Sequence, residues 1–139
     1  MRLWHKDLIE VLPKQQLLGQ WRECCAIARQ IGVNGKVNHI LVNRINDYPI
    51  EHFMAYCKKV QAEMIRRGYS CNIGGVSQWL KKDIPEFLDC TDDDIFYDWH
   101  NARYMWQCYC NLEEKYDCGG ISEEEWAKVE GRMRMWKGW

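Results

Sequence analysis

Apolar side chains recur every three or four residues along three long stretches of the chain, and no other feature constrains the fold as strongly. The clearest stretch spans residues 50–64, and similar stripes cover residues 17–31 and 95–116. An α-helix turns once in about 3.6 residues, so each stripe lies on one helix face that can pack against a core. We therefore predict an all-α fold with three main helices, a short C-terminal helix and long ordered loops.

Proline, glycine and capping residues indicate where the first two helices begin and end. The first helix is expected to follow Pro13, which suits a first helical turn, and to stop at Gly32. The second is expected to be capped by Asp47, with Pro49 in its first turn, and to end before Gly68. Both predicted helices are long enough to contribute a full apolar face to the core.

Capping pairs of the same kind precede the two remaining helices. Thr91, followed three residues later by Asp94, predicts the start of the third helix, which should run to Gly119. Ser122 with Glu125 predicts a short fourth helix. The remaining segments are expected to be irregular: residues 32–46, residues 69–90 with one helical turn near 77–82, and the tail 132–139.

Length and composition favour one folded domain over residues 1–139. The chain has 139 residues, of which 47% are hydrophobic, so it can bury a real core. Its first residues lack the apolar run of a signal peptide, and no stretch has the length and composition of a membrane span. We expect a cytoplasmic protein whose eight cysteines stay reduced and act first as small core residues.

The overall charge does not favour nucleic acid binding. Lys and Arg number 19 against 20 acidic residues, which gives a net charge of −1. Many nucleic-acid binders are basic throughout, so this balance counts against DNA as a partner. However, acidic residues cluster at 92–94 and 123–125, and phosphate binding depends on local fields. A basic face elsewhere on the molecule is therefore still compatible with the sequence.

The segment from Gln15 to Ala28, QQLLGQWRECCAIA, is the most specific motif in the chain. It resembles the first long helix of the pyrimidine-dimer DNA glycosylase (endonuclease V) family, in which a glutamine, an apolar pair and an aromatic-Arg-Glu triplet have this spacing. Arg22 and Glu23 fall on the Arg-Glu pair of that family without a gap. Looser similarities at residues 66–69 and 100–115 extend the resemblance over most of the chain.

The resemblance implies a DNA repair glycosylase that also cleaves abasic sites, with double-stranded damaged DNA as its partner and no metal or organic cofactor. Its nucleophile would be the N-terminal amine, which attacks the sugar C1′ and forms an imine. Arg2 is too bulky to favour removal of the initiator, so Met1 itself would supply the amine. α-Amines suit this role because a larger fraction of them than of lysine amines is neutral near pH 7. Glu23 would stabilise the sugar cation and move protons during β-elimination.

The same resemblance and the residue types suggest DNA contacts. Arg2 would match the arginine that follows the nucleophile, and Arg22 would bind phosphate. Gln15 and Lys115 are weaker matches of the same kind. The tail combines basic and aromatic groups, so Trp136, Lys137 and Trp139 could grip a distorted strand, although frayed exposed aromatics are an equally good interpretation.

Two further interpretations concern histidines and cysteines. His5, near the proposed amine, and His100, within the third-helix match, are accessory candidates, with structural roles favoured for both. Cys108, Cys110 and Cys118 with His100 lack the paired spacing of structural zinc sites, so we expect no metal. The competing hypothesis is a non-catalytic helical module that retains this fold to bind DNA or a protein. The sequence identifies neither the lesion nor the oligomeric state.

Overall fold

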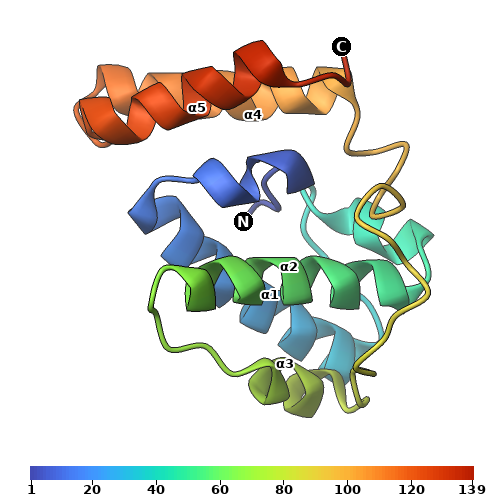
Figure 1. Cartoon of the computed structure of the whole chain (residues 1–139). Helices are drawn as coiled ribbons and strands as arrows, with labels where there is room; N and C mark the ends of the chain where they lie inside the picture. Colours follow the sequence, from blue (N-terminus) through green and yellow to red (C-terminus); the bar gives the residue numbers. More distant parts are fainter.

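Helices account for all the regular secondary structure of the computed structural model, which describes residues 1–139 (Figure 1). The α-helices are α1 (Lys14–Asn34), α2 (Ile50–Arg66), α3 (Ile73–Leu80), α4 (Ala102–Asp117) and α5 (Glu123–Met135). Two 3₁₀ helices, η1 (Lys6–Val11) and η2 (Asn43–Asp47), precede α1 and α2. The predicted all-α class, with three helices longer than the others, is confirmed.

The helices form layers around one buried core. α1 packs against both α2 and α3, while α4 and α5 lie side by side at the opposite end of the molecule, with η1 between α5 and α2 (Figure 1). The buried apolar residues form one connected cluster that extends from Leu3 to Met133. The amino-terminal segment therefore contributes to the core and is held inside the fold.

Gly32 is not the end of the first helix, contrary to the prediction. α1 continues to Asn34, and the residue that leaves the helix is Gly35, with a left-handed φ of 79°. A Cβ placed on Gly32 would lie 1.8 Å from the carbonyl oxygen of Trp79 in α3. Gly32 therefore allows α3 to approach α1 closely, which is a tertiary requirement that resembles a stop signal in the sequence.

The segment expected to be a loop at residues 69–90 contains a complete helix. α3 begins after Asn72, whose side chain accepts a hydrogen bond from the Gly74 backbone N–H at 2.8 Å. The predicted turn near residues 77–82 is therefore too short and begins too late. An asparagine cap compensates for the low helical propensity of the two glycines in the first turn.

The third helix also begins later than predicted. Thr91 and Asp94 make the expected capping contacts, but Phe96 then adopts a left-handed φ of 48° that interrupts the helix. The Lys6 ammonium donates hydrogen bonds to the carbonyl oxygens of Asp93 and Ile95, both at 2.8 Å. These two carbonyl oxygens accept hydrogen bonds from a buried lysine of a distant segment and not from backbone N–H groups of a helix, so α4 starts only at residue 102.

The remaining boundaries are partly as predicted. α2 ends before Gly68, which has a φ of 85°, but it starts after Pro49 because residues 43–47 form η2 and Tyr48 is extended. Asp47 is therefore not its cap. The Ser122–Glu125 capping box of α5 is confirmed, yet α5 runs to Met135 and includes half of the predicted tail.

Candidate active site

The amino-terminal segment is fixed by hydrogen bonds from a single buried side chain on α1. Gln20 is 1% exposed, and its Nε2 donates to the Arg2 carbonyl oxygen at 2.9 Å. Its Oε1 accepts from the Trp4 backbone N–H at 2.7 Å. One amide thus binds the backbone on both sides of Leu3, which itself is fully buried. The chain therefore leaves the core in a defined direction towards Met1.

Two tyrosines complete this anchor. The Tyr56 hydroxyl donates to the Trp4 carbonyl oxygen at 2.6 Å and lies 2.9 Å from Gln20 Oε1. The Tyr104 hydroxyl donates to the Leu3 carbonyl oxygen. Burial raises the pKa of both phenols, so both remain protonated donors at neutral pH. Gln20, Tyr56 and Tyr104 come from α1, α2 and α4, so three separate helices fix the position of the amino-terminal segment.

The anchored terminus lies in a hollow of about 320 Å³. Four of the residues predicted from the sequence meet there: Met1, Arg2, Glu23 and Lys115. The other lining residues are Trp4, Gln16, Gly19, Gln20, Leu41 and Asn111. Met1, one acidic residue and two basic residues thus line one pocket from the terminus, α1 and α4. We refer to this hollow as the amino-terminal pocket.

The charged groups of the amino-terminal pocket are not neutralised by one another. None of Met1, Arg2, Glu23 and Lys115 takes part in an ion pair within 4.0 Å, and five such pairs exist elsewhere in the protein. The Arg2 guanidinium lies over the Trp4 ring, 5.5 Å from its centroid. Two basic side chains, Arg2 and Lys115, against one carboxylate give the pocket lining a positive balance that suits an anionic ligand.

The two α1 residues predicted to bind DNA lie outside the lining of this pocket. Gln15 and Arg22 are both exposed. Arg22 extends over Gly19, with Nη2 only 3.8 Å from the site that a Cβ on this glycine would occupy, so it lies at the rim. Gln16, which the sequence did not single out, lines the pocket in place of Gln15.

Neither histidine candidate lines the amino-terminal pocket. His5 Nε2 donates to the His100 carbonyl oxygen at 2.8 Å, and His100 Nδ1 accepts from the Lys6 backbone N–H at 2.9 Å. Burial lowers the pKa of His5 to about 4 and that of His100 well below its ordinary value. Both rings are therefore neutral at neutral pH and tie the segment before α4 to the start of the chain.

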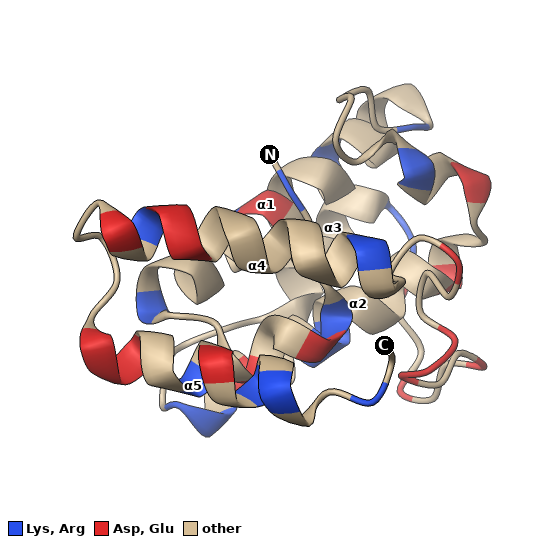
Figure 2. Ribbon diagram, turned by 90° about the horizontal axis from the view of Figure 1, so that it is seen from above, with Lys and Arg blue, Asp and Glu red and all other residues tan.

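The tail candidates lie on the other side of α4 from the amino terminus (Figure 2). Trp136 Nε1 donates to Asp7 Oδ2 at 2.8 Å, and its ring packs edge-on against His5. Trp139 is 58% exposed and contacts Trp136, while Lys137 is exposed. The structure thus gives Trp136 a packing role and does not bring the tail to the amino-terminal pocket.

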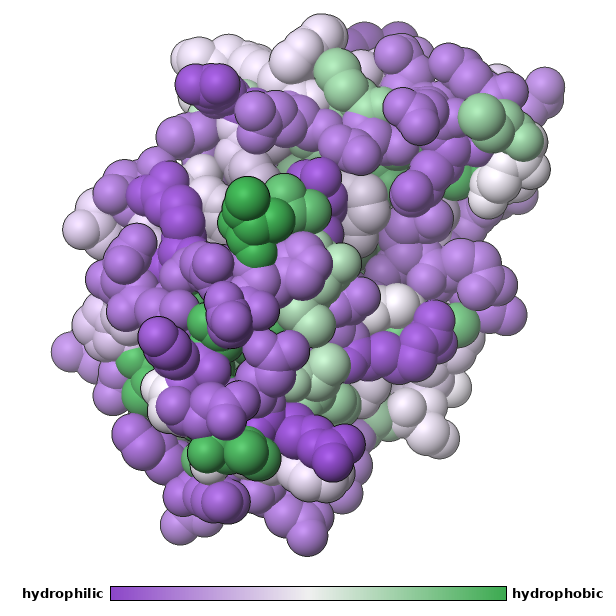
Figure 3. Space-filling view, turned by 180° about the vertical axis from the view of Figure 1, so that it is seen from behind, coloured by the Kyte–Doolittle hydropathy of each residue, from purple (hydrophilic) through white to green (hydrophobic).

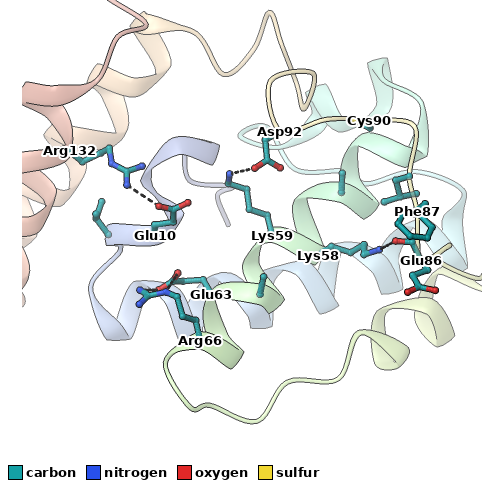
Figure 4. A pocket seen from close by; sticks show the side chains of 14 residues that line it. Glu10, Lys58, Lys59, Glu63, Arg66, Glu86, Phe87, Cys90, Asp92 and Arg132 are labelled. Carbon is teal, nitrogen blue, oxygen red and sulfur yellow. Dashed lines mark hydrogen bonds and ion pairs between the residues drawn. The ribbon is translucent and has the colours of Figure 1, made fainter.

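A larger hollow, of about 730 Å³, lies over α2 and contains more charged residues (Figure 4). Most of its charges are already paired: Lys59 with Asp92 at 2.9 Å, Arg132 with Glu10 at 3.1 Å, and Arg66 with the buried Glu63. Lys58 donates to backbone carbonyl oxygens at residues 85 and 86. We call it the α2 pocket; its ion pairs leave few groups free to meet a ligand.

Two further features bear on the choice of site: the character of the rear face and the absence of a cluster of metal-binding side chains. The rear face is mostly hydrophilic, with hydrophobic side chains in small groups (Figure 3). Nowhere do three His, Cys, Asp or Glu side chains converge in a geometry that could hold a metal ion, and all eight cysteines are free thiols. None of the helices combines the length and apolar character needed to cross a membrane.

Comparison with known proteins identifies the family. The family model described as pyrimidine dimer DNA glycosylase matches residues 1–74. No curated protein and no solved structure matches the chain. The matched region contains the amino terminus, α1 and α2, and therefore Met1, Arg2 and Glu23 with their anchor Gln20, whereas Lys115 and the tail lie outside it. The chain belongs to the pyrimidine dimer DNA glycosylase family, a family of DNA repair enzymes.

Proposed function

We propose that this protein excises pyrimidine dimers, or a related base lesion, from duplex DNA and then cleaves the abasic site, with the Met1 amine as nucleophile. One observation carries the proposal: Gln20, Tyr56 and Tyr104 anchor the amino terminus in a pocket that also contains Glu23. Chain termini are usually poorly ordered. An ordered amino terminus in the same pocket as a carboxylate is expected if the terminal amine must be positioned for a reaction.

The first chemical step is displacement of the damaged base. The lone pair of the Met1 amine attacks C1′, the C1′–N bond breaks, and the base leaves with that electron pair and takes up a proton. The secondary ammonium formed at Met1 gives up one proton, so its nitrogen regains a lone pair. Positive charge develops on the sugar as the bond breaks, and the Glu23 carboxylate is placed in the same pocket to stabilise it. Covalent capture by an amine divides a difficult hydrolysis into easier steps.

The second step is strand cleavage from the imine. The C1′–O4′ bond breaks as the nitrogen forms a double bond to C1′, and O4′ takes up a proton. A base then removes a proton from C2′, and the C3′–O bond breaks with loss of the 3′ phosphate. Glu23 is the only carboxylate lining the pocket, so we assign it the proton transfers.

The charges around the pocket provide the contacts with DNA. Arg2 and Lys115, free of ion pairs, would bind the phosphates flanking the extruded nucleotide. Arg22 at the rim would bind a neighbouring phosphate, and exposed Gln15 would lie along the same strand. Trp136, Lys137 and Trp139 could reach only DNA that extends around α4, so their proposed contact is the more distant one.

Incision of defined duplexes tests the proposal. We expect the pure protein to nick a duplex with a single abasic site, and one with a single cyclobutane pyrimidine dimer, in the presence of EDTA. An abasic duplex that is bound but never nicked would indicate that the protein is a non-catalytic binding module. Nicking of the abasic duplex alone would support the imine chemistry and assign the protein another lesion.

A further inference from the structure

Gln16 carries a polar atom that the folded protein leaves without a partner. Its Oε1 is buried and accepts no hydrogen bond, although the residue lines the amino-terminal pocket. Donors from Met1, Arg2, Lys115 and Asn111 line the same pocket, and none of them reaches it. Buried acceptors in proteins are almost always bonded, so an unpaired one on a residue that lines a candidate site suggests a ligand group that donates to it.

An intact nucleotide offers few groups of this kind. Phosphate oxygens, the ester oxygens and the sugar ring oxygen O4′ only accept hydrogen bonds, so the backbone of closed-ring DNA cannot satisfy Gln16 Oε1. A donor appears on the sugar when its ring opens. The C1′–O4′ bond breaks, the nitrogen lone pair forms the imine double bond, and O4′ gains a proton to become a hydroxyl on C4′.

We propose that Gln16 Oε1 accepts a hydrogen bond from the C4′ hydroxyl of the ring-opened sugar. This inference rests on the proposed function, because it requires the imine. A hydroxyl held by Gln16 is kept from attacking C1′ again, so the bond opposes ring closure and increases the fraction of enzyme present as imine. Gln16 would thus contact the open sugar and leave recognition of the intact duplex to the charged residues.

Borohydride trapping on a duplex with one abasic site measures the imine directly. Gln16→Met keeps the length of the side chain and removes the acceptor, and Gln78→Met makes the same change on an exposed helical residue of α3, outside the amino-terminal pocket. We expect Gln16→Met to lower the initial trapping rate about five- to tenfold, in line with the loss of one hydrogen bond, and Gln78→Met to leave it unchanged. Gln16→Glu, which retains an acceptor, should recover most of the rate at saturating DNA.

Binding to a duplex with a tetrahydrofuran site provides the second measurement, because this abasic analogue has no C1′ hydroxyl and cannot open. Gln16→Met should change its Kd by less than about twofold, since the acceptor has no role before the ring opens. An equal loss of trapping and of tetrahydrofuran binding would overturn the proposal, and so would normal trapping by Gln16→Met. Failure of the wild-type protein to be trapped would instead reject the proposed function itself.

Discussion

The α2 pocket and the amino-terminal pocket both contain acidic and basic side chains, but those of the α2 pocket are mostly paired and those of the amino-terminal pocket are not. The α2 pocket is more than twice as large, about 730 against 320 Å³, but its arginines and lysines are joined to carboxylates or carbonyl oxygens. In the smaller pocket, Glu23, Arg2 and Lys115 make no ion pair. Paired charges stabilise a surface, whereas unpaired charges beside an anchored terminus can act on a ligand. Size alone would have favoured the α2 pocket over the pocket that we propose as the active site.

Exchange of one carboxylate in each pocket for its amide should separate these roles most clearly. We expect Glu23→Gln to lower abasic-site nicking by about a hundredfold or more, because it removes a positioned acid–base group. DNA affinity and thermal stability should stay near the wild-type values. Glu10→Gln in the α2 pocket is the matched control and should nick at the normal rate. Near-normal nicking by Glu23→Gln would make Glu23 a surface residue.

A substitution of Glu63, the buried carboxylate of the α2 pocket, should lower the stability of the protein and leave its activity unchanged. Burial alone would raise the pKa of Glu63, but hydrogen bonds from Arg66 and Arg67 outweigh it and hold that pKa below the ordinary value. Glu63→Gln should lower the free energy of unfolding at neutral pH by about 1–3 kcal/mol, with normal nicking per folded molecule. Urea titrations and active-site-normalised rates measure the two effects.

The pH dependence of the same variant sharpens the test. Because the pKa of Glu63 is lower in the folded state, its contribution is complete above the unfolded value, near 4.5, and is lost as the pH falls through the folded value. The stabilities of wild type and Glu63→Gln should therefore converge in acid. A constant difference down to the acid transition would mean that the guanidinium contacts do not depend on the charge of Glu63.

The anchor of the amino-terminal pocket should affect both stability and chemistry. Gln20→Met leaves the Arg2 carbonyl and the Trp4 N–H without their partner, so we expect a lower melting temperature and about tenfold slower borohydride trapping, through misplacement of the amine. Tyr104→Phe, which removes one contact to Leu3, should be milder in both respects. A lower melting temperature together with unchanged trapping, measured at a temperature where Gln20→Met is folded, would limit Gln20 to a packing role.

A smaller effect is expected from the arginine at the rim. Arg22→Ala should weaken binding to damaged and undamaged duplex alike and reduce the dependence of log Kd on log salt by about one unit, as the loss of one phosphate contact should. Arg66→Ala, in the paired α2 pocket, should leave this slope unchanged. Equal slopes for wild type and Arg22→Ala would remove Arg22 from the DNA interface.

The sequence predicted the elements of the fold better than their ends. Helical stripes, the end of α2 before Gly68 and the capping box at Ser122 are local features, and local features can be read from spacing. The errors arose where a distant residue decides the outcome. The carbonyl oxygen of Trp79 leaves no room for a side chain at Gly32. Lys6 donates to two carbonyl oxygens before α4, which are then not used to extend that helix.

The candidate site was also predicted in part. The resemblance of the first helix led to Met1, Arg2 and Glu23, and the structure brings them together with Lys115. The anchor residue Gln20 was missed, although a signal existed: it falls on the buried stripe between Leu17 and Cys24, where a polar residue must find partners. Gln16 carried no such signal, because only the structure shows that its Oε1 is enclosed.

The attachment point of DNA after borohydride reduction tests the central proposal most directly. The wild-type protein would be trapped on a duplex with one abasic site, digested, and the linked peptide mapped by mass spectrometry. We predict attachment to the α-amine of Met1, since Met1 lines the same pocket as Glu23, the backbone that follows it is anchored, and α-amines as a class are more often neutral than lysines near neutral pH. Attachment to Lys115 or any other lysine would contradict the account, because the anchored terminus would then have no part in the chemistry.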